Sequence, residues 1–223
     1  MHVVWGNRLP HRAVNLNYEP HPTVLCMMDL QTFDAFLASN IDIDPDIVAR
    51  LTQTCRRMEL KKGEFALRAG ETCKHSFFVE HGLLKQYTID EKGKEHILLF
   101  APEYWFAANI ETVHFGRPSD YFMEALEPTS ILLLDQPLID RLSEEFPAFR
   151  NFNSNLLHSQ IQELQGRVTL LLSSSAEERY LDFTRRFPSL MLRVSQVQIA
   201  AYLGMTPEAL SRVRRDLAKK WKK

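Results

Sequence analysis

The chain has 223 residues, of which 45% are hydrophobic and 25% are charged, and its net charge is −1 at pH 7. These are ordinary values for a soluble globular protein, and the length allows one large domain or two small ones. No stretch approaches the ~20 apolar residues of a membrane span and no secretory signal is present, so we expect a cytoplasmic protein with no membrane partner.

The cysteines are few and dispersed. Cys26, Cys55 and Cys73 form no C-x-x-C pair, so the sequence predicts neither a zinc knuckle nor a disulfide framework. The histidines also lack the spacing of metal ligands. We therefore predict no metal and no resident cofactor.

The first segment, residues 1–28, has no clear periodicity and is expected to be a poorly ordered extension. Two helices should follow. The first is marked by Leu30, Phe33 and Leu37. The second begins at Asp44, a good N-cap before a proline in the first helical position. Its inward stripe is Ile47, Val48, Leu51 and Cys55.

A run of short strands follows between residues 59 and 134. Each is rich in β-branched or aromatic residues and is bounded by glycine or proline turns. The predicted strands are 65–67, 76–80, 83–89, 96–100, 121–125 and 130–134. Six or more strands in so short a stretch favour a closed or double-sheet β-barrel.

One long helix is expected from Pro137 to about Ser173. Its second half repeats apolar residues at alternating spacings of four and three, which is the narrow stripe of a helix paired with its twin. The residues of this predicted dimer seam are Leu157, Ile161, Leu164, Val168 and Leu171. Simple packing on the barrel is the alternative. The chain then breaks near residues 173–176, a helix is expected over 177–187, and a short strand over 190–194.

The last thirty residues predict two short helices joined by a tight turn. Ser195 can cap the first helix, and Val197, Ala200, Ala201 and Leu203 would give it apolar faces. Gly204 suits the left-handed turn, and Thr206 before Pro207 suits the start of the second helix. In the second helix Leu210, Val213 and Leu217 form a buried stripe. This is the layout of a helix-turn-helix, which places one helix in a DNA major groove.

The opposite face of the second helix carries residue types that contact bases and phosphates. From Ser195 to Lys223 there are seven lysines and arginines against two acidic residues, a net charge of +5 on a chain of net charge −1. A basic end on an acidic body is typical of phosphate binding by one module. The candidate DNA-contacting residues are Thr206, Pro207, Glu208, Ser211, Arg212, Arg215 and Lys219.

The order of these segments resembles the Crp/Fnr family of bacterial transcription regulators over residues 30–217. The resemblance rests on Arg68–Glu71, the glycine-containing stretch 78–87, Ala176–Arg179 and Gly204–Arg212. It implies an α+β fold in which helices flank a cyclic-nucleotide-binding-type β-barrel (a double-stranded β-helix or jelly roll). The domains are then 1–28 extension, 29–136 sensor barrel, 137–174 dimerisation helix and linker, and 175–223 helix-turn-helix. Because few residues follow Leu217, we expect no β-hairpin wing of the kind that many relatives carry.

The effector end departs from that family. Cyclic-nucleotide binders hold the ribose and phosphate with a Gly-Glu pair and an Arg-Ser pair. Alignment places Ala108–Asn109 and Ser119–Asp120 at those positions, so a cyclic AMP phosphate would be poorly neutralised. An alternative alignment recruits Arg117. The three cysteines also do not supply the four of an iron–sulfur sensor. The candidate effector-pocket residues are Gly82, Trp105, Asn109, Arg117, Ser119, Asp120 and Tyr121.

The sequence therefore predicts a homodimeric regulator that reads a palindromic site on double-stranded DNA, with an effector of unknown identity. An activator would also contact RNA polymerase. The alternative is a small-molecule or cyclic-nucleotide sensor whose output is a protein–protein contact, which Pro207 and the missing wing favour slightly. A barrel enzyme is a third reading, but the chain offers no nucleophile–base pair and no glycine-rich phosphate loop.

Overall fold

A computed structural model describes residues 32–220. Two short helices come first, α1 (Phe33–Asn40) and α2 (Pro45–Thr52). The Asp44 side chain caps α2 by accepting the backbone N–H of Asp46 at 2.9 Å, as expected from the sequence. Leu30 and the extension 1–28 lie outside the described residues.

Within the described part of the chain, eight strands form the barrel. They are β1 (Arg57–Leu60), β2 (Phe65–Leu67), β3 (His75–His81), β4 (Leu84–Ile89), β5 (Glu95–Ala101), β6 (Phe106–Ala107), β7 (Phe122–Ala125) and β8 (Thr129–Asp135). They make two four-stranded sheets in the orders β1-β8-β3-β6 and β2-β7-β4-β5. The short helix α3 (Ile110–Phe115) lies between β6 and β7. The predicted jelly roll is confirmed, although the sequence did not indicate β1 or β6.

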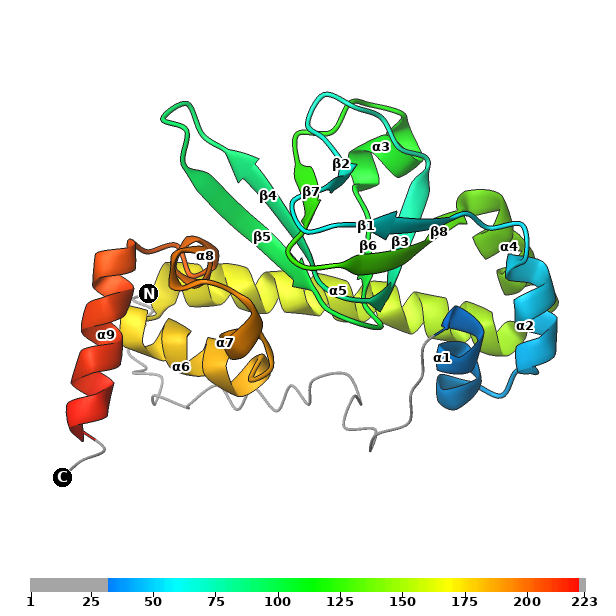
Figure 1. Ribbon diagram of the computed structural model, residues 1–223. Helices are drawn as coiled ribbons and strands as arrows, with labels where there is room; N and C mark the ends of the chain where they lie inside the picture. Colours follow the sequence, from blue (N-terminus) through cyan, green and yellow to red (C-terminus); the bar gives the residue numbers. More distant parts are fainter. Residues whose placement is uncertain (1–31, 221–223) are drawn as a thin grey trace, which may run out of the picture.

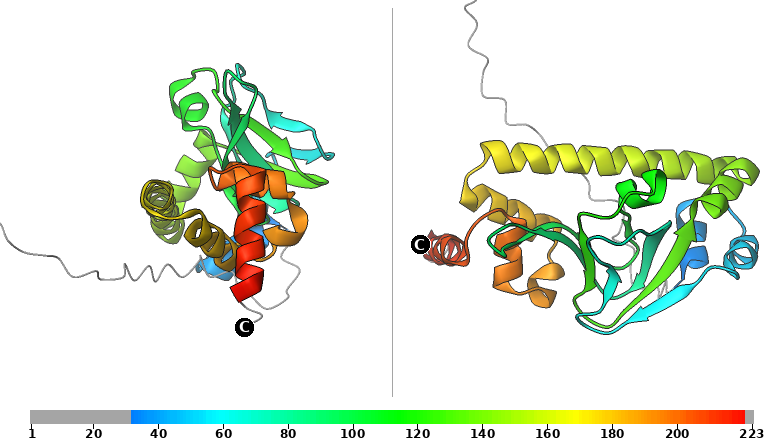
Figure 2. Two further views of the ribbon diagram at one scale, coloured as in Figure 1. Left: turned by 90° about the vertical axis from the view of Figure 1, so that its left-hand side faces the viewer. Right: turned by 90° about the horizontal axis from the view of Figure 1, so that it is seen from above.

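The predicted single helix over residues 137–173 is wrong in one respect. The chain forms α4 (Gln136–Glu145), turns at Phe146, and starts α5 (Pro147–Ser173) with proline in its first turn. Proline has no backbone N–H to continue the hydrogen bonds of α4, so that helix ends before it. In the first turn of α5 the missing N–H is not needed, so proline is tolerated there. α5 then runs beside the barrel along the length of the molecule (Figures 1 and 2).

Four helices form the C-terminal unit at the far end of α5 (Figure 1). They are α6 (Ala176–Arg186), α7 (Leu190–Arg193), α8 (Gln196–Tyr202) and α9 (Pro207–Lys220). The prediction of a strand over residues 190–194 is wrong, because this segment forms the one-turn helix α7. Its apolar run Leu-Met-Leu looks like a buried strand, but such short runs do not distinguish the two.

The barrel and the C-terminal unit share one hydrophobic core. Phe100 on β5 lies with its ring centroid 5.3 Å from that of Tyr202 on α8 and 6.4 Å from that of Phe183 on α6. Leu83, Tyr87, Ile97 and Leu126 belong to the same buried cluster. The two parts are therefore packed together, rather than joined by a free linker. Among the described residues, no helix is long and apolar enough to cross a membrane.

Candidate functional site

The helix-turn-helix is formed by α8 and α9. Ser195 caps α8 in a reciprocal pair with Gln198. Gly204 has φ of +64°, the left-handed turn that glycine adopts without strain. Thr206 Oγ1 then accepts the backbone N–H of Ala209 at 3.2 Å and caps α9. These features confirm the local prediction, except that Val197 is 61% exposed instead of facing the core.

One side of α9 is buried and the other is open. Leu210 and Leu217 are buried, and Val213 packs beside them. All seven candidate DNA-contacting residues are exposed. Five of them, at spacings of three and four, form what we call the reading face: Glu208, Ser211, Arg212, Arg215 and Lys219. The carboxylate of Glu208 accepts hydrogen bonds from the backbone N–H of Glu208 and from the Thr206 hydroxyl, which hold its pKa below the usual value. This carboxylate is therefore charged at neutral pH.

A second site is a cavity of about 350 Å³ between the barrel, α1 and α5, which we call the barrel–helix cavity. Its walls come from α1, the strands β4 and β5, the segment 103–108 and one face of α5. Most of its lining side chains are aromatic or aliphatic. Such a volume lies in the range of small-molecule sites.

The predicted pocket residues lie mostly elsewhere. Trp105 lines the cavity, whereas the other six candidates do not. Asn109 and Ser119 are buried and bond to each other, with Asn109 Nδ2 2.6 Å from Ser119 Oγ. Arg117 is exposed and pairs with Glu111 at 3.3 Å.

The two residues that the family alignment puts at the phosphate-binding positions, Asn109 and Ser119, are thus engaged with each other and with the backbone. Asn109 Oδ1 accepts the backbone N–H of Glu111 at 3.0 Å and caps α3. Ser119 Oγ donates to the Tyr121 carbonyl at 2.8 Å. Asp120, the residue after Ser119, is exposed and carries a negative charge, which would repel a phosphate. These residues do not fit a cyclic nucleotide phosphate, which needs a positioned cation and free N–H donors.

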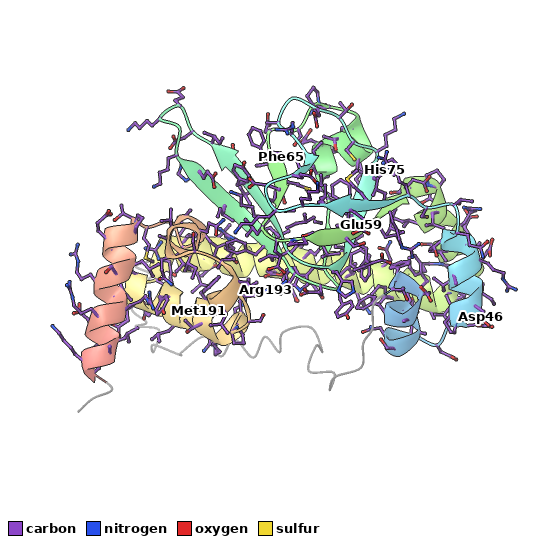
Figure 3. All side chains as sticks on the ribbon, viewed as in Figure 1. Asp46, Glu59, Phe65, His75, Met191 and Arg193 are labelled. Atoms are coloured by element: carbon purple, nitrogen blue, oxygen red, sulfur yellow. The ribbon has the colours of Figure 1, made fainter. Side chains whose placement is uncertain are left out.

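Gly82 lies at a contact between the barrel and the C-terminal unit. Its backbone oxygen accepts from Arg193 Nη2 at 2.9 Å. Arg193, on α7, also pairs with Glu103 Oε1 at 2.8 Å and Glu127 Oε1 at 2.6 Å. We call Arg193, Glu103 and Glu127 the interdomain ion-pair cluster; Figure 3 labels Arg193 where α7 meets the barrel.

The cluster is largely removed from water, with the Arg193 side chain 21% exposed. Burial alone would raise the pKa of Glu103, but the hydrogen bond and charge of Arg193 outweigh it and hold that pKa below its usual value. Burial would likewise lower the pKa of Arg193, but both carboxylates outweigh it and raise it. Glu103 and Arg193 are therefore both charged at neutral pH.

Arg167 makes a second connection from α5. Its Nη2 donates to the Ile97 carbonyl of β5 at 2.7 Å and to the Tyr202 carbonyl of α8 at 2.9 Å, and its Nη1 donates to the Leu98 carbonyl. Its guanidinium lies 3.8 Å from the Tyr202 ring centroid. One side chain thus joins α5, the barrel and the helix-turn-helix. No sequence pattern pointed to Arg193 or Arg167, because their partners are distant in the chain.

The predicted dimer seam lies on an open face of α5. Its five residues are between 41% and 63% exposed. Leu164 both belongs to the seam and lines the barrel–helix cavity. Within residues 32–220 there is no group of three histidine, cysteine or acidic side chains that could hold a metal ion. Cys26 lies outside that range.

Known proteins share this architecture. Residues 57–146 match the family model of the cyclic nucleotide-binding domain. The structure of FixK2 from Bradyrhizobium japonicum superposes with a TM-score of 0.64 at 18% identity, over 75% of this chain and 86% of that one. The c-di-GMP-responsive regulator CLP from Xanthomonas campestris gives 0.65 at 13% identity, over 79% and 93%. At these identities the likeness shows the fold.

Sequence relatives identify the family. The transcriptional activator protein anr of Pseudomonas aeruginosa is 31% identical over 171 residues, which cover 71% of this chain and 68% of that protein. The fumarate nitrate reduction regulatory protein of Klebsiella oxytoca is 31% identical over 171 residues, with 71% and 67% covered. The chain belongs to the Crp/Fnr family and is a transcription regulator rather than an enzyme.

Proposed function

We propose that this regulator reads a palindromic DNA site as a homodimer, with the reading face of α9 in the major groove of each half-site. The exposed, capped and basic α9 carries this proposal. Arg212 and Glu208 have the chemistry to contact guanine and cytosine edges, whereas Lys219 can contact phosphate. Reading a bacterial chromosome implies a cytoplasmic location, and activation would add a contact with RNA polymerase.

The seam of α5 supports the two-fold arrangement. Five apolar side chains at alternating spacings of four and three are 41–63% exposed in the isolated chain. A second copy of α5 would remove them from water by pairing along the same stripe. The two-fold axis of the protein would then match the symmetry of the operator.

The docked C-terminal unit would fix the distance between the two recognition helices. In each protomer the interdomain ion-pair cluster and Arg167 tie this unit to the barrel. Rigid placement removes the orientational cost of engaging the second half-site. An effector in the barrel–helix cavity would act by changing this docking, because Glu103 and Arg167 line the cavity and also hold the unit.

We propose that the effector is not cyclic AMP; the bond between Asn109 and Ser119, the residues aligned with the family's phosphate-binding positions, supports this. The proposal also includes no iron–sulfur cluster. Isothermal calorimetry with cyclic AMP and cyclic GMP tests the first point. Binding in the micromolar range would contradict it.

Selection of genomic DNA fragments by the purified protein tests DNA reading. We expect a palindromic motif that Arg212→Ala degrades at one base pair per half-site, at a cost of about 1–3 kcal/mol. Lys219→Ala is the matched comparison, because it should weaken all sequences alike and lower the salt dependence. Binding that is sensitive to salt but blind to sequence would refute the proposal and favour a protein–protein output.

A further inference from the structure

The barrel–helix cavity has flat aromatic walls on several sides. Its aromatic lining residues are Phe36, Tyr104, Trp105, Phe106, Phe152 and Tyr202. The Phe36 and Tyr104 rings are stacked, with centroids 5.9 Å apart and planes inclined by 7°. Aromatic side chains pack best against other rings, face to edge or offset face to face. The walls therefore favour a planar, unsaturated ligand.

The charged groups of the lining are all engaged. Glu103 is paired with Arg193, and Glu163 lies 2.7 Å from Arg186. Arg167 donates to three backbone carbonyls. An anionic ligand could recruit Arg167 only by leaving those carbonyls without their donor, which is costly in a buried site. The cavity thus offers no spare counter-charge, and charge complementarity favours a neutral ligand.

Some neutral polar side chains of the lining make no hydrogen bond to other described residues. The amide of Gln86 on β4 and the hydroxyl of Ser159 on α5 make no side-chain hydrogen bond within residues 32–220. Gln86 can donate and accept, and so can Ser159. These two groups would orient a ligand that carries a hydroxyl or carbonyl substituent.

The wall at Tyr104 is held in a conformation that non-glycine residues rarely adopt. Its φ is +66°, which costs on the order of 1 kcal/mol. Hydrogen bonds to β3 maintain it, with Tyr104 N 2.7 Å from the Val79 carbonyl and Val79 N 3.0 Å from the Trp105 carbonyl. Trp105 in turn lies with its ring centroid 6.0 Å from that of Phe187 in the C-terminal unit. The same turn therefore faces both the cavity and the helix-turn-helix.

We propose that the barrel–helix cavity binds a neutral, planar aromatic molecule with a hydroxyl or carbonyl group. This inference rests on the proposed role of the cavity as the effector site, and it names the chemical class. The volume of about 350 Å³ is roughly twice the ~150 Å³ of an engineered cavity that binds benzene, so a two-ring compound has room. Binding against Tyr104 and Trp105 places the ligand on the turn that contacts the C-terminal unit.

The test uses two probes with the same ring system and different charge. 2-Naphthol is neutral at pH 7, and 2-naphthoate is anionic. Titration is followed by Trp105 fluorescence in the full chain carrying Trp5→Phe and Trp221→Phe, which leaves one tryptophan. We expect saturable quenching by 2-naphthol, and binding of 2-naphthoate at least about tenfold weaker, equivalent to about 1.4 kcal/mol. Equal or tighter binding of 2-naphthoate would overturn the proposal.

Two variants locate the probe. Ala108→Phe adds a ring to the cavity lining and should abolish 2-naphthol binding. Gln86→Leu should weaken it severalfold, whereas Gln162→Leu, on an exposed part of α5, should not. Retention of 2-naphthol binding in Ala108→Phe would place the probe elsewhere and refute the assignment. Circular dichroism of each variant confirms that it is folded.

Two further outcomes separate this inference from the proposed function. If the operator is still bound but 2-naphthol is not, the ligand class is wrong and the DNA-reading function stands. If Ile161→Asp monomers bind 2-naphthol but the wild-type dimer does not, the partner's α5 fills the cavity, and this too overturns the ligand proposal. If the wild-type protein binds 2-naphthol but no operator, the DNA-reading function is refuted and the ligand class stands.

Discussion

Replacing Arg193 by alanine should weaken the docking of the C-terminal unit on the barrel without unfolding the barrel. Arg193 contacts both oxygens of Glu103 and both of Glu127, at 2.6–3.4 Å, and donates to the Gly82 carbonyl at 2.9 Å. Removing one partner of a buried ion pair costs roughly 3–5 kcal/mol. Because the three side chains are 21–33% exposed, water screens part of this interaction, and we expect about 2–3 kcal/mol.

Hydrogen exchange measures that change directly. A loss of about 2–3 kcal/mol raises the population of the undocked state by about 30- to 150-fold. Exchange should accelerate in peptides spanning α7 and in the segment around Gly82, whose N–H bonds to Glu103 at 3.1 Å. The far end of the β3–β8 ladder, where His75 pairs with Asp135 and Ser76 with Leu134, should keep its protection, because it is the end of β3 opposite Gly82.

Arg185→Ala is the matched control. It also removes an arginine from the C-terminal unit, but Arg185 is 73% exposed and pairs with Asp182 inside α6. An exposed pair of this kind contributes at most about 1 kcal/mol. Equal exchange in the two variants would refute the reasoning. So would additivity in a double-mutant cycle of Arg193→Ala with Glu103→Gln, because groups in one cluster must couple.

Three further predictions concern pH, assembly and the barrel turn. The pKa of Glu103 is lowered, so its contribution to docking is complete above the usual glutamate pKa of about 4.3 and is lost as pH falls through the lowered value. Hydrogen exchange of α7, measured from pH 7 to 3 and corrected for the intrinsic effect of pH on exchange, should accelerate only at the acid end. Faster exchange above pH 6 would contradict this. Ile161→Asp should dissociate the proposed dimer in sedimentation experiments, because the paired α5 helices would bury two like charges. Gln162→Asp, beside the seam, should not. A dimer in both variants would place the interface elsewhere. Gly82→Ala should destabilise the protein by about 2–4 kcal/mol in urea unfolding, since φ is +87° and a Cβ would lie 2.5 Å from the Pro128 carbonyl oxygen; a change below 1 kcal/mol would show that the turn can relax.

The helix-turn-helix could be predicted from sequence because its signals are local. The cap at Ser195, the left-handed Gly204 and the start at Thr206–Pro207 each act within a few residues. Local rules of this kind transfer well from peptides to proteins. The alternation of strands and turns likewise predicted the barrel, although two-residue β6 is too short to leave a periodic signal.

The cavity and the interdomain contacts could not be predicted in the same way. Arg193 meets Glu103 across 90 residues of chain, and Arg167 meets Leu98 across 69. The family pattern pointed to Asn109 and Ser119, and their side chains bond to each other. Long-range complementarity of this kind depends on the packing of the whole fold, which no local pattern encodes.

The shared core has a consequence for modular engineering. Tyr202, Phe183 and Leu190 are buried partly by residues of the barrel, including Phe100 and Leu83. A fragment starting at α6 would expose that apolar surface to water, so it should be prone to aggregation when expressed alone. A chimera that grafts these four helices onto another sensor would need the matching surface of β5 and an arginine at the place of Arg167. We therefore expect that the C-terminal unit cannot be exchanged between regulators without its matching barrel surface.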